Sequence, residues 1–176
     1  MTLIATPGAA NANSYLDVAT ADAYFANRPN AAAWAAVGVS AAKEPYLISA
    51  TRILETRIVW SGLRSTTTQA LDWPRTMVQD PNYPDTNRDI GVRWLDSTIV
   101  PQDVQDACCE MAFALIASDR TLDASSRGIK KAKVGSLEVE FDGSMAPPVL
   151  CRAARDLMRP YGRFAGSDGS IELVRA

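Results

Sequence analysis

The stretch PQDVQDACCEMAFALIASD, residues 101–119, decides the fold because it predicts a helix with more apolar surface than a protein exterior tolerates. Pro101 suits the first position of a helix, and the acids after it suit the positive end of the helix dipole. Two apolar stripes follow: Val104, Cys108, Met111 and Leu115, and then Cys109, Phe113 and Ile116. Residues 111–117 are apolar on all sides, as expected at the centre of a bundle or where a helix is shared between core and subunit interface.

Further helices are predicted on both sides of this one. Asp17 or Thr20 can cap a helix that ends at Arg28, and residues 31–37 give one or two further turns that carry Trp34. Ser40 can cap a longer helix to residue 60, although Pro45 favours a start near Glu44 or an irregular first turn. Its apolar stripe is Leu47, Ala50, Leu54 and Ile58.

A last helix is predicted over residues 147–164, with an apolar face and an arginine stripe opposite it. The apolar face is Leu150, Ala154, Leu157 and Tyr161, and the stripe is Arg152, Arg155, Arg159 and Arg163. Such a stripe is usual on a solvated helix face, but it could also contact phosphate or an acidic partner. The fold class predicted is mainly α, a small helical bundle with a hairpin and a tail.

The hairpin is predicted over residues 129–141, where the apolar period changes from helical to alternating. Gly135 and Ser136 suit a two-residue type II′ turn. Lys130 and Lys131 lie on one arm and Glu138 and Glu140 on the other. Opposite charges across two strands favour their pairing, so we expect a protruding, charged β-hairpin.

Single-domain organisation is expected for residues 1–176, with an arm over 1–14, the bundle and hairpin over 15–161, and a tail over 162–176. The loop-rich residues 61–100 predict short strands or turns within 69–75 and 91–100. The tail is either a frayed end or a strand that joins another subunit's sheet edge, and we favour the second. Its β-prone residues are Ile171, Leu173 and Val174.

Trp73 lies in the stretch QALDWPRTMV, residues 69–78, directly before Pro74. The residue before a proline is pushed away from helical conformations, so Trp73 is expected in an extended segment. Its indole could close over the bundle core or anchor an interface, and we favour the lid. In that arrangement Arg75 would lie outside, where a neighbouring subunit could contact it.

Catalysis is not predicted, because the 176 residues contain no histidine and no catalytic motif. We therefore expect no enzyme activity, no metal and no cofactor. Cys108, Cys109 and Cys151 fit reduced thiols of a cytoplasmic setting, and buried hydrophobes rather than a reactive pair. Neither a signal peptide nor a membrane span is predicted. A net charge of -2 does not favour a dedicated nucleic-acid binder, although a local basic patch is compatible with it.

A series of stretches resembles the head–tail connector, or adaptor, proteins of tailed bacteriophages, including relatives often labelled "DnaT-like". They occur in family order and cover most of the chain: NSYLDVATADAYFANR (13–28), LISATRILETRIVWSGLR (47–64), QALDWPR (69–75), VPQDVQDACCEMAFAL (100–115), KVGSLEVEF (133–141) and GSIELVRA (169–176). The segment 76–99, which contains Tyr83 and Trp94, is fuller than the spacer of that family.

The resemblance implies a structural subunit of the virion neck that assembles in the host cytoplasm. It would form a homo-oligomeric ring, a dodecamer in the family, below the portal protein and dock the next neck or tail-completion protein. Double-stranded DNA would pass through during packaging and ejection without sequence-specific binding. The residues predicted to bind partners are Trp73, Arg75, Lys130, Lys131, Glu138, Glu140, Arg152, Arg155, Arg159, Ile171, Leu173 and Val174.

The alternative is a single-stranded DNA-binding accessory of replication, as the label "DnaT-like" suggests. Such a protein needs a basic groove with aromatic side chains on which bases stack. Trp34 and Trp60 are expected on helices, where core packing explains them. The adaptor is therefore the function that the sequence favours.

Overall fold

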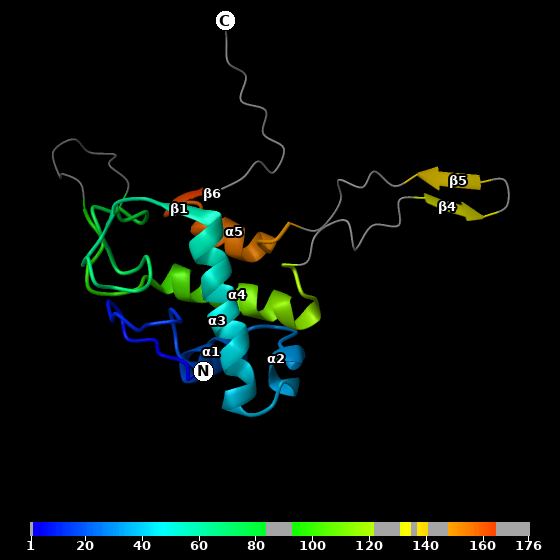
Figure 1. Cartoon of the computed structure of the whole chain (residues 1–176), viewed down its shortest axis with the longest axis horizontal. Coiled ribbons are helices and arrows are strands. Elements are labelled where there is room, and N and C mark those ends of the chain that lie inside the picture. Colours follow the sequence, from blue (N-terminus) through cyan, green and yellow to red (C-terminus); the bar gives the residue numbers. More distant parts are fainter. Residues whose placement is uncertain (1, 84–92, 122–130, 135–136, 141–147, 165–176) are drawn as a thin grey trace, which may run out of the picture.

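The computed structural model describes residues 2–83, 93–121, 131–134, 137–140 and 148–164, and the fold is mainly α, as predicted (Figure 1). The helices are α1 (Val18–Ala26), α2 (Ala32–Ala36), α3 (Ser40–Arg57), α4 (Gln102–Ala117) and α5 (Arg152–Met158). The strands are β1 (Ile58–Trp60), β2 (Leu63–Arg64), β3 (Arg75–Thr76), β4 (Lys131–Val134), β5 (Leu137–Glu140) and β6 (Gly162–Phe164). The predicted tail, from residue 165 onward, lies outside the described residues.

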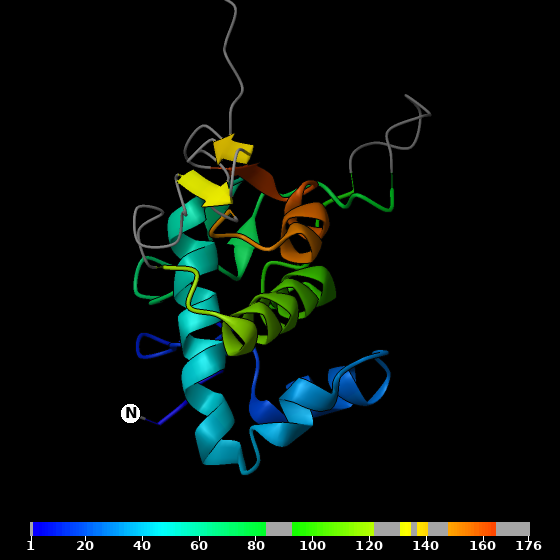
Figure 2. The same cartoon turned by 90° about the vertical axis from the view of Figure 1, so that its right-hand side faces the viewer.

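Helix α4 crosses α3 and packs against both α3 and α5, so the helix from residues 101–119 is central, as predicted (Figures 1 and 2). Val104 and residues 107–112 are buried, residues 113–116 are partly buried, and Gln102 and Ala117 at the two ends are exposed. Pro101 is the N-cap of α4 rather than its first residue. No helix in the part of the chain that is described has the length and apolarity that a membrane span requires.

The amino-terminal helices are fixed by a cap and by aromatic stacking. Asp17 caps α1, as predicted, because its carboxylate accepts from the Thr20 amide at 2.7 Å. Phe25 of α1 stacks on Trp34 of α2 with a centroid distance of 4.6 Å. Helix α3 begins at Ser40, so Pro45 lies within the helix instead of postponing its start.

Strands β1 and β6 replace the ends of two predicted helices. Helix α3 ends at Arg57 and α5 at Met158, and Ile58–Trp60 then pairs antiparallel with Gly162–Phe164. The β-branched Ile58 and Val59 suit a strand, and Gly162 permits the close approach. A Cβ on Gly162 would lie 2.6 Å from the Val59 carbonyl oxygen. Trp60 is therefore in a strand, not in a helix.

An aromatic cluster joins the core to the loop that precedes β3. The rings of Tyr15, Trp60, Trp73 and Tyr161 meet edge to face in sequence, at centroid distances of 6.4, 5.8 and 5.9 Å. These rings belong to one continuous hydrophobic core that includes α3, α4 and α5. Edge-to-face contacts stabilise beyond the area they bury, by about 0.5–1.5 kcal/mol each.

The predicted hairpin is present as β4 and β5. Val134 lies opposite Leu137 and Lys131 lies opposite Glu140, whereas the turn predicted at Gly135 and Ser136 lies outside the described residues. Figure 1 shows this hairpin to one side of the helices. The strands predicted within 69–75 and 91–100 are confined to β3, which pairs with β2, and to a single bridge between Gln79 and Trp94.

Candidate functional site

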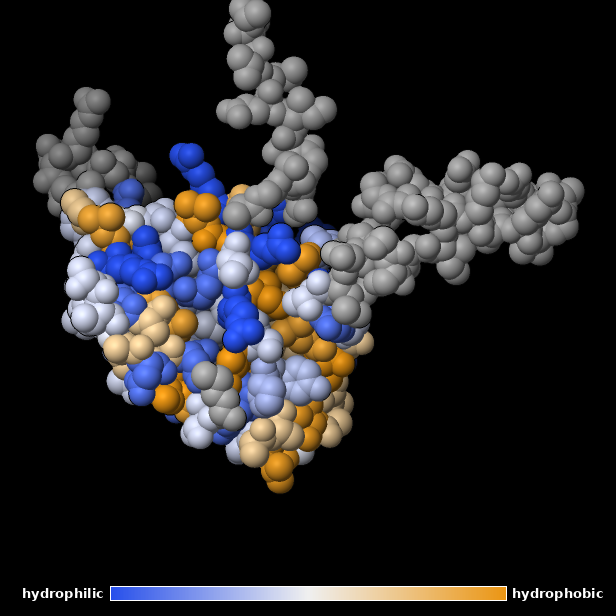
Figure 3. Space-filling view, in the orientation of Figure 1, coloured by the Kyte–Doolittle hydropathy of each residue, from blue (hydrophilic) through white to orange (hydrophobic). Residues whose placement is uncertain are grey.

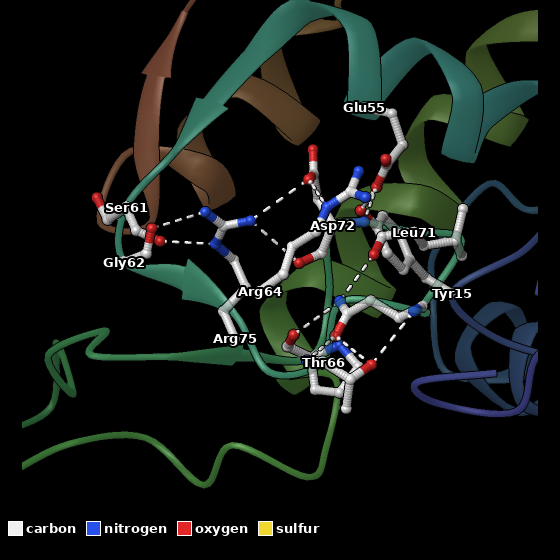
Figure 4. A network of polar contacts seen from close by, with 11 residues as sticks. Tyr15, Glu55, Ser61, Gly62, Arg64, Thr66, Leu71, Asp72 and Arg75 are labelled. Carbon is white, nitrogen blue, oxygen red and sulfur yellow. Dashed lines mark hydrogen bonds and ion pairs between the residues drawn. The ribbon is translucent and has the colours of Figure 1, made fainter. Parts of the chain in front are cut away.

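Trp73 and Arg75, predicted as partner-binding residues, both point into the protein. Trp73 is 1% exposed and closes over the core as expected. Arg75 is only 7% exposed, so the expectation that it lies outside is wrong. Its Nε and one terminal nitrogen donate to the carbonyls of Ser61 and Gly62 at 2.7 and 2.8 Å (Figure 4). A charged side chain is therefore used to hold a turn.

The same network fixes the rest of residues 69–75. Gln69 donates to the carbonyls of Leu71 and Pro74 at 2.8 and 3.0 Å. Asp72 accepts from Arg64 at 2.8 Å, and its own amide donates to Glu55 at 2.9 Å. Tyr15 also donates to Glu55. Since these polar groups satisfy one another, the network explains how the loop folds rather than what it binds.

An arginine surface is formed by α5, β6 and the end of α3. We use this name for Arg57, Arg152, Arg155, Arg159 and Arg163. The Arg155 guanidinium lies 5.0 Å from the centroid of Phe164, which pairs with Ile58 directly after Arg57. Strand pairing between β1 and β6 therefore brings arginines from distant parts of the chain together. In Figure 3, hydrophilic residues lie among hydrophobic ones in the upper part of the molecule, where these elements lie.

The arginine surface is weakly neutralised. Within the described ranges, Arg57, Arg159 and Arg163 form no ion pair with a carboxylate, and Arg152 lies 3.7 Å from Asp156. Basic residues elsewhere lie closer to their carboxylate partners. The nitrogen-to-oxygen distance is 2.6 Å for Arg28 and Glu110, 2.7 Å for Lys43 and Asp22, and 2.8 Å for Arg64 and Asp72. Among the described residues of α5 and β6, basic side chains outnumber acidic ones, although the chain carries a net charge of -2.

An apolar ridge lies beside this surface. We use this name for the exposed residues Val59, Leu63, Met77 and Trp94. Val59 lies opposite Arg163 in the β1–β6 pair, and Leu63 lies opposite Thr76 in the β2–β3 pair. Sequence reasoning missed the ridge, because its members come from three short segments whose pairing no local pattern reveals.

The other predicted partner-binding residues are distributed as follows. Arg152, Arg155 and Arg159 do share one surface. Lys131, Glu138 and Glu140 lie in the paired backbone of the hairpin. Lys130, Ile171, Leu173 and Val174 lie outside the described residues.

Reactive or metal-binding groups do not gather at either surface. Cys108, Cys109 and Cys151 are free and buried, as predicted. Burial raises the pKa of the Cys108 thiol to about 12, so it stays protonated at neutral pH. The described residues contain no group of three or more side chains suited to hold a metal ion.

Comparison with known proteins supports the alternative interpretation of the sequence better than the connector. A family model described as "Putative DnaT-like ssDNA binding protein" matches residues 1–176. No curated protein and no solved structure shows significant similarity to the chain.

Proposed function

The chain belongs to this DnaT-like family, and from that premise we propose that it binds single-stranded DNA along the arginine surface. The observation that carries the proposal is that Arg57, Arg159 and Arg163 are exposed, lie on or next to the β1–β6 pair, and have no described carboxylate to neutralise them. Guanidinium groups bind phosphate through paired donors, and release of condensed cations from the DNA drives the association.

Binding of this kind needs no base-specific contacts. The arginines would contact the phosphate backbone, which is the same for every sequence, and a single strand is flexible enough to follow a small surface. Because the net charge of the chain is -2, the affinity would depend on local contacts rather than on the overall field of the chain.

The test measures the anisotropy of a labelled oligothymidylate at low salt, with charge-reversal variants. Arg159→Glu and Arg163→Glu are each expected to weaken binding about tenfold, because each replaces an attraction to phosphate by a repulsion. Arg52→Glu is the matched control, because Arg52 is also exposed and the change of charge is the same. Arg52 is not part of the arginine surface and instead lines a pocket with Ala12, Asn13 and Leu71. It is expected to leave binding within about twofold.

Two outcomes would contradict the proposal. If the wild-type protein left the oligonucleotide unbound at low salt, single-stranded DNA would not be its ligand. If Arg52→Glu weakened binding as much as Arg159→Glu, the affinity would follow total charge and the arginine surface would have no special part.

A second candidate is the head–tail adaptor of a phage neck. It is favoured by the position of the β4–β5 hairpin to one side of the helices, and by the exposed apolar ridge, which a protein partner could cover (Figure 1). In this role the chain would form a ring on the portal protein and dock the next neck or tail protein, and DNA would pass without being held.

The adaptor is tested by assembly rather than by DNA binding. Light scattering and electron microscopy of the protein, alone and mixed with a portal protein, are expected to reveal rings. A protein that stays monomeric in both samples would remove this candidate. If the protein forms rings but does not bind the oligonucleotide, the adaptor function would be favoured over single-stranded DNA binding.

A further inference from the structure

Trp94 differs from the other three tryptophans in its exposure. Trp34, Trp60 and Trp73 are 2%, 7% and 1% exposed and belong to the core, whereas Trp94 is 53% exposed. Trp94 is thus the one tryptophan whose ring face a ligand could cover without unfolding the protein.

A short antiparallel ribbon holds Trp94 in place. The Leu95 amide donates to the Val78 carbonyl at 2.9 Å, and the Asp80 amide donates to the Arg93 carbonyl at 2.9 Å. Val78 is buried and Leu95 partly buried, so the ribbon is anchored to the core on that side. Trp94 lies opposite Gln79 in the ribbon, and both are exposed.

The basic residue beside Trp94 is itself ordered by its neighbours. The Arg93 guanidinium lies 5.4 Å from the Tyr83 ring centroid, and its Nε lies 3.9 Å from an Asp80 oxygen. An exposed indole next to an oriented guanidinium is a combination that suits a nucleotide, since the ring can stack on a base while the cation attracts phosphate.

The apolar ridge connects Trp94 to the arginine surface in short steps. Val59 faces Arg163 across the strand pair, and Leu63 follows Val59 by four residues, a span of at most about 14 Å. Leu63 faces Thr76, the neighbour of Met77, and the next residue, Val78, bonds to the Trp94–Leu95 segment. Paired strands and backbone hydrogen bonds therefore link the ribbon that carries Arg163 to the segment that carries Trp94.

We infer that Trp94 is a base-stacking residue: an unpaired base of a DNA strand bound on the arginine surface lies on its indole. The inference rests on the proposed single-strand binding and names the contact by which bases, rather than phosphates, are held. The ligand class is unpaired nucleobases without sequence preference, because every base offers a flat face to an aromatic ring.

The experiment follows tryptophan emission and oligonucleotide anisotropy together, on the full chain. An oligothymidylate of about 20 nucleotides is used, longer than the ~4–16 that small OB-fold single-strand binders cover. Wild-type emission is expected to be quenched on binding. Trp94→Ala is expected to abolish the quench and to weaken binding about 5- to 100-fold. Trp94→Phe is expected to abolish the quench but retain most of the affinity, because phenylalanine also stacks.

Val39→Ala is the control, since Val39 is an exposed apolar residue at the N-terminal end of α3, whereas the β1–β6 pair follows the C-terminal end of that helix. It is expected to keep both the quench and an affinity within about threefold of the wild type, because Val39 belongs neither to the apolar ridge nor to the arginine surface. Urea unfolding of all variants checks that they fold, which is expected because both side chains are exposed.

Each remaining outcome separates the inference from the function on which it rests. If the wild type binds no oligonucleotide, the proposed function fails and the inference with it. If the wild type binds but Trp94→Ala keeps both affinity and quench, the inference alone is overturned. If Trp94→Ala binds DNA normally and loses self-association in light scattering, the ridge is a protein interface and base stacking is rejected.

Discussion

At the scale of the residue, Arg75 illustrates how a charge can serve folding. Its guanidinium is a planar fork, and the carbonyls of Ser61 and Gly62 lie where two of its donors point. A third hydrogen bond goes to the Asp72 carbonyl at 3.1 Å. Burial lowers the pKa of Arg75, but an arginine begins so high that the side chain remains charged at neutral pH. The buried guanidinium therefore keeps its charge and donates hydrogen bonds to three backbone carbonyls.

Arg75→Lys keeps the charge but cannot reproduce the fork, so carbonyls of the turn lose their donors. We expect the free energy of unfolding to fall by about 2–4 kcal/mol, measured by urea denaturation. Arg159→Lys, on the exposed arginine surface, is the control and is expected to change it by less than about 0.5 kcal/mol. Equal stability of the two variants would contradict a structural role for Arg75.

Glu110 makes stability depend on pH. Burial alone would raise the pKa of its carboxyl, but hydrogen bonds from Arg28, at 2.6 and 3.0 Å, and from Tyr24, at 2.7 Å, outweigh it and hold the pKa below its ordinary value. A lowered carboxyl pKa stabilises the fold above the pKa of the unfolded chain, and the stabilisation is lost as pH falls through the folded pKa.

Glu110→Gln therefore removes one source of acid sensitivity. We expect the variant to be less stable than the wild type near neutral pH, because Arg28 loses its ionised partner. Between about pH 6 and about pH 3 it is expected to lose less of its remaining stability than the wild type does. Urea midpoints at a series of pH values measure both effects. A parallel decline of the two proteins would show that Glu110 does not carry this dependence.

At the scale of the element, the helices could be predicted from sequence and the β1–β6 pair could not. Helices α1, α2 and α4 follow from caps and apolar spacing within the segment itself. The pattern that predicts α3 continues through Ile58, and only a partner about a hundred residues away turns 58–60 into a strand. Hydrophobic periodicity shows which face of a local segment is apolar. It therefore contains no information about pairing between strands that lie about a hundred residues apart in the sequence.

In the candidate site, too, the residues of one helix could be predicted to lie together, and those joined by long-range pairing could not. The spacing of Arg152, Arg155 and Arg159 predicts their common face, because it is a property of one helix. Arg163 was predicted on the same helical stripe, but α5 ends at Met158 and Arg163 lies in β6. Arg57 comes next to β6 only through the β1–β6 pair, so its place could not be predicted. The exposure predicted for Arg75 was wrong, since nothing in its own stretch shows that the carbonyls of residues 61 and 62 face it.

Gly62 tests the turn between β1 and β2. It has a φ of +69°, and a Cβ there would lie 2.2 Å from the Thr76 carbonyl oxygen. Gly38 also has a positive φ, +91°, but a Cβ there would meet nothing within 4 Å. Gly38→Ala is expected to cost about 1 kcal/mol from backbone strain, and Gly62→Ala at least about 3 kcal/mol, because it adds a collision. Thermal or urea unfolding measures the difference, and similar costs would mean that the turn relaxes.

At the scale of the whole molecule, the three thiols report on the integrity of the core. Burial raises the pKa of Cys109 and Cys151 as well as that of Cys108, and thiols rather than thiolates are poor nucleophiles. We expect Ellman's reagent to leave the native protein unmodified over minutes and to react with all three cysteines in guanidinium chloride. Rapid modification of a thiol in the native protein would show that the core opens locally. If Cys151→Ser abolished this rapid reaction, Cys151, the most exposed of the three cysteines, would be the thiol that reacts.

The distribution of charge over the whole molecule predicts how DNA binding responds to salt. With a net charge of -2, the protein as a whole does not attract a polyanion, so the proposed binding would come from local contacts of the arginine surface. If about four arginines contact phosphate, the logarithm of the association constant is expected to fall with the logarithm of the salt concentration with a slope of about -3, at roughly 0.7 per contact for a single strand. Arg159→Glu is expected to make this slope shallower by about 0.7 or more, whereas Trp94→Ala lowers the affinity and leaves the slope unchanged, because stacking releases no cations. Anisotropy titrations over a series of salt concentrations separate the two, and a slope near zero for the wild type would show that arginine–phosphate contacts do not hold the strand.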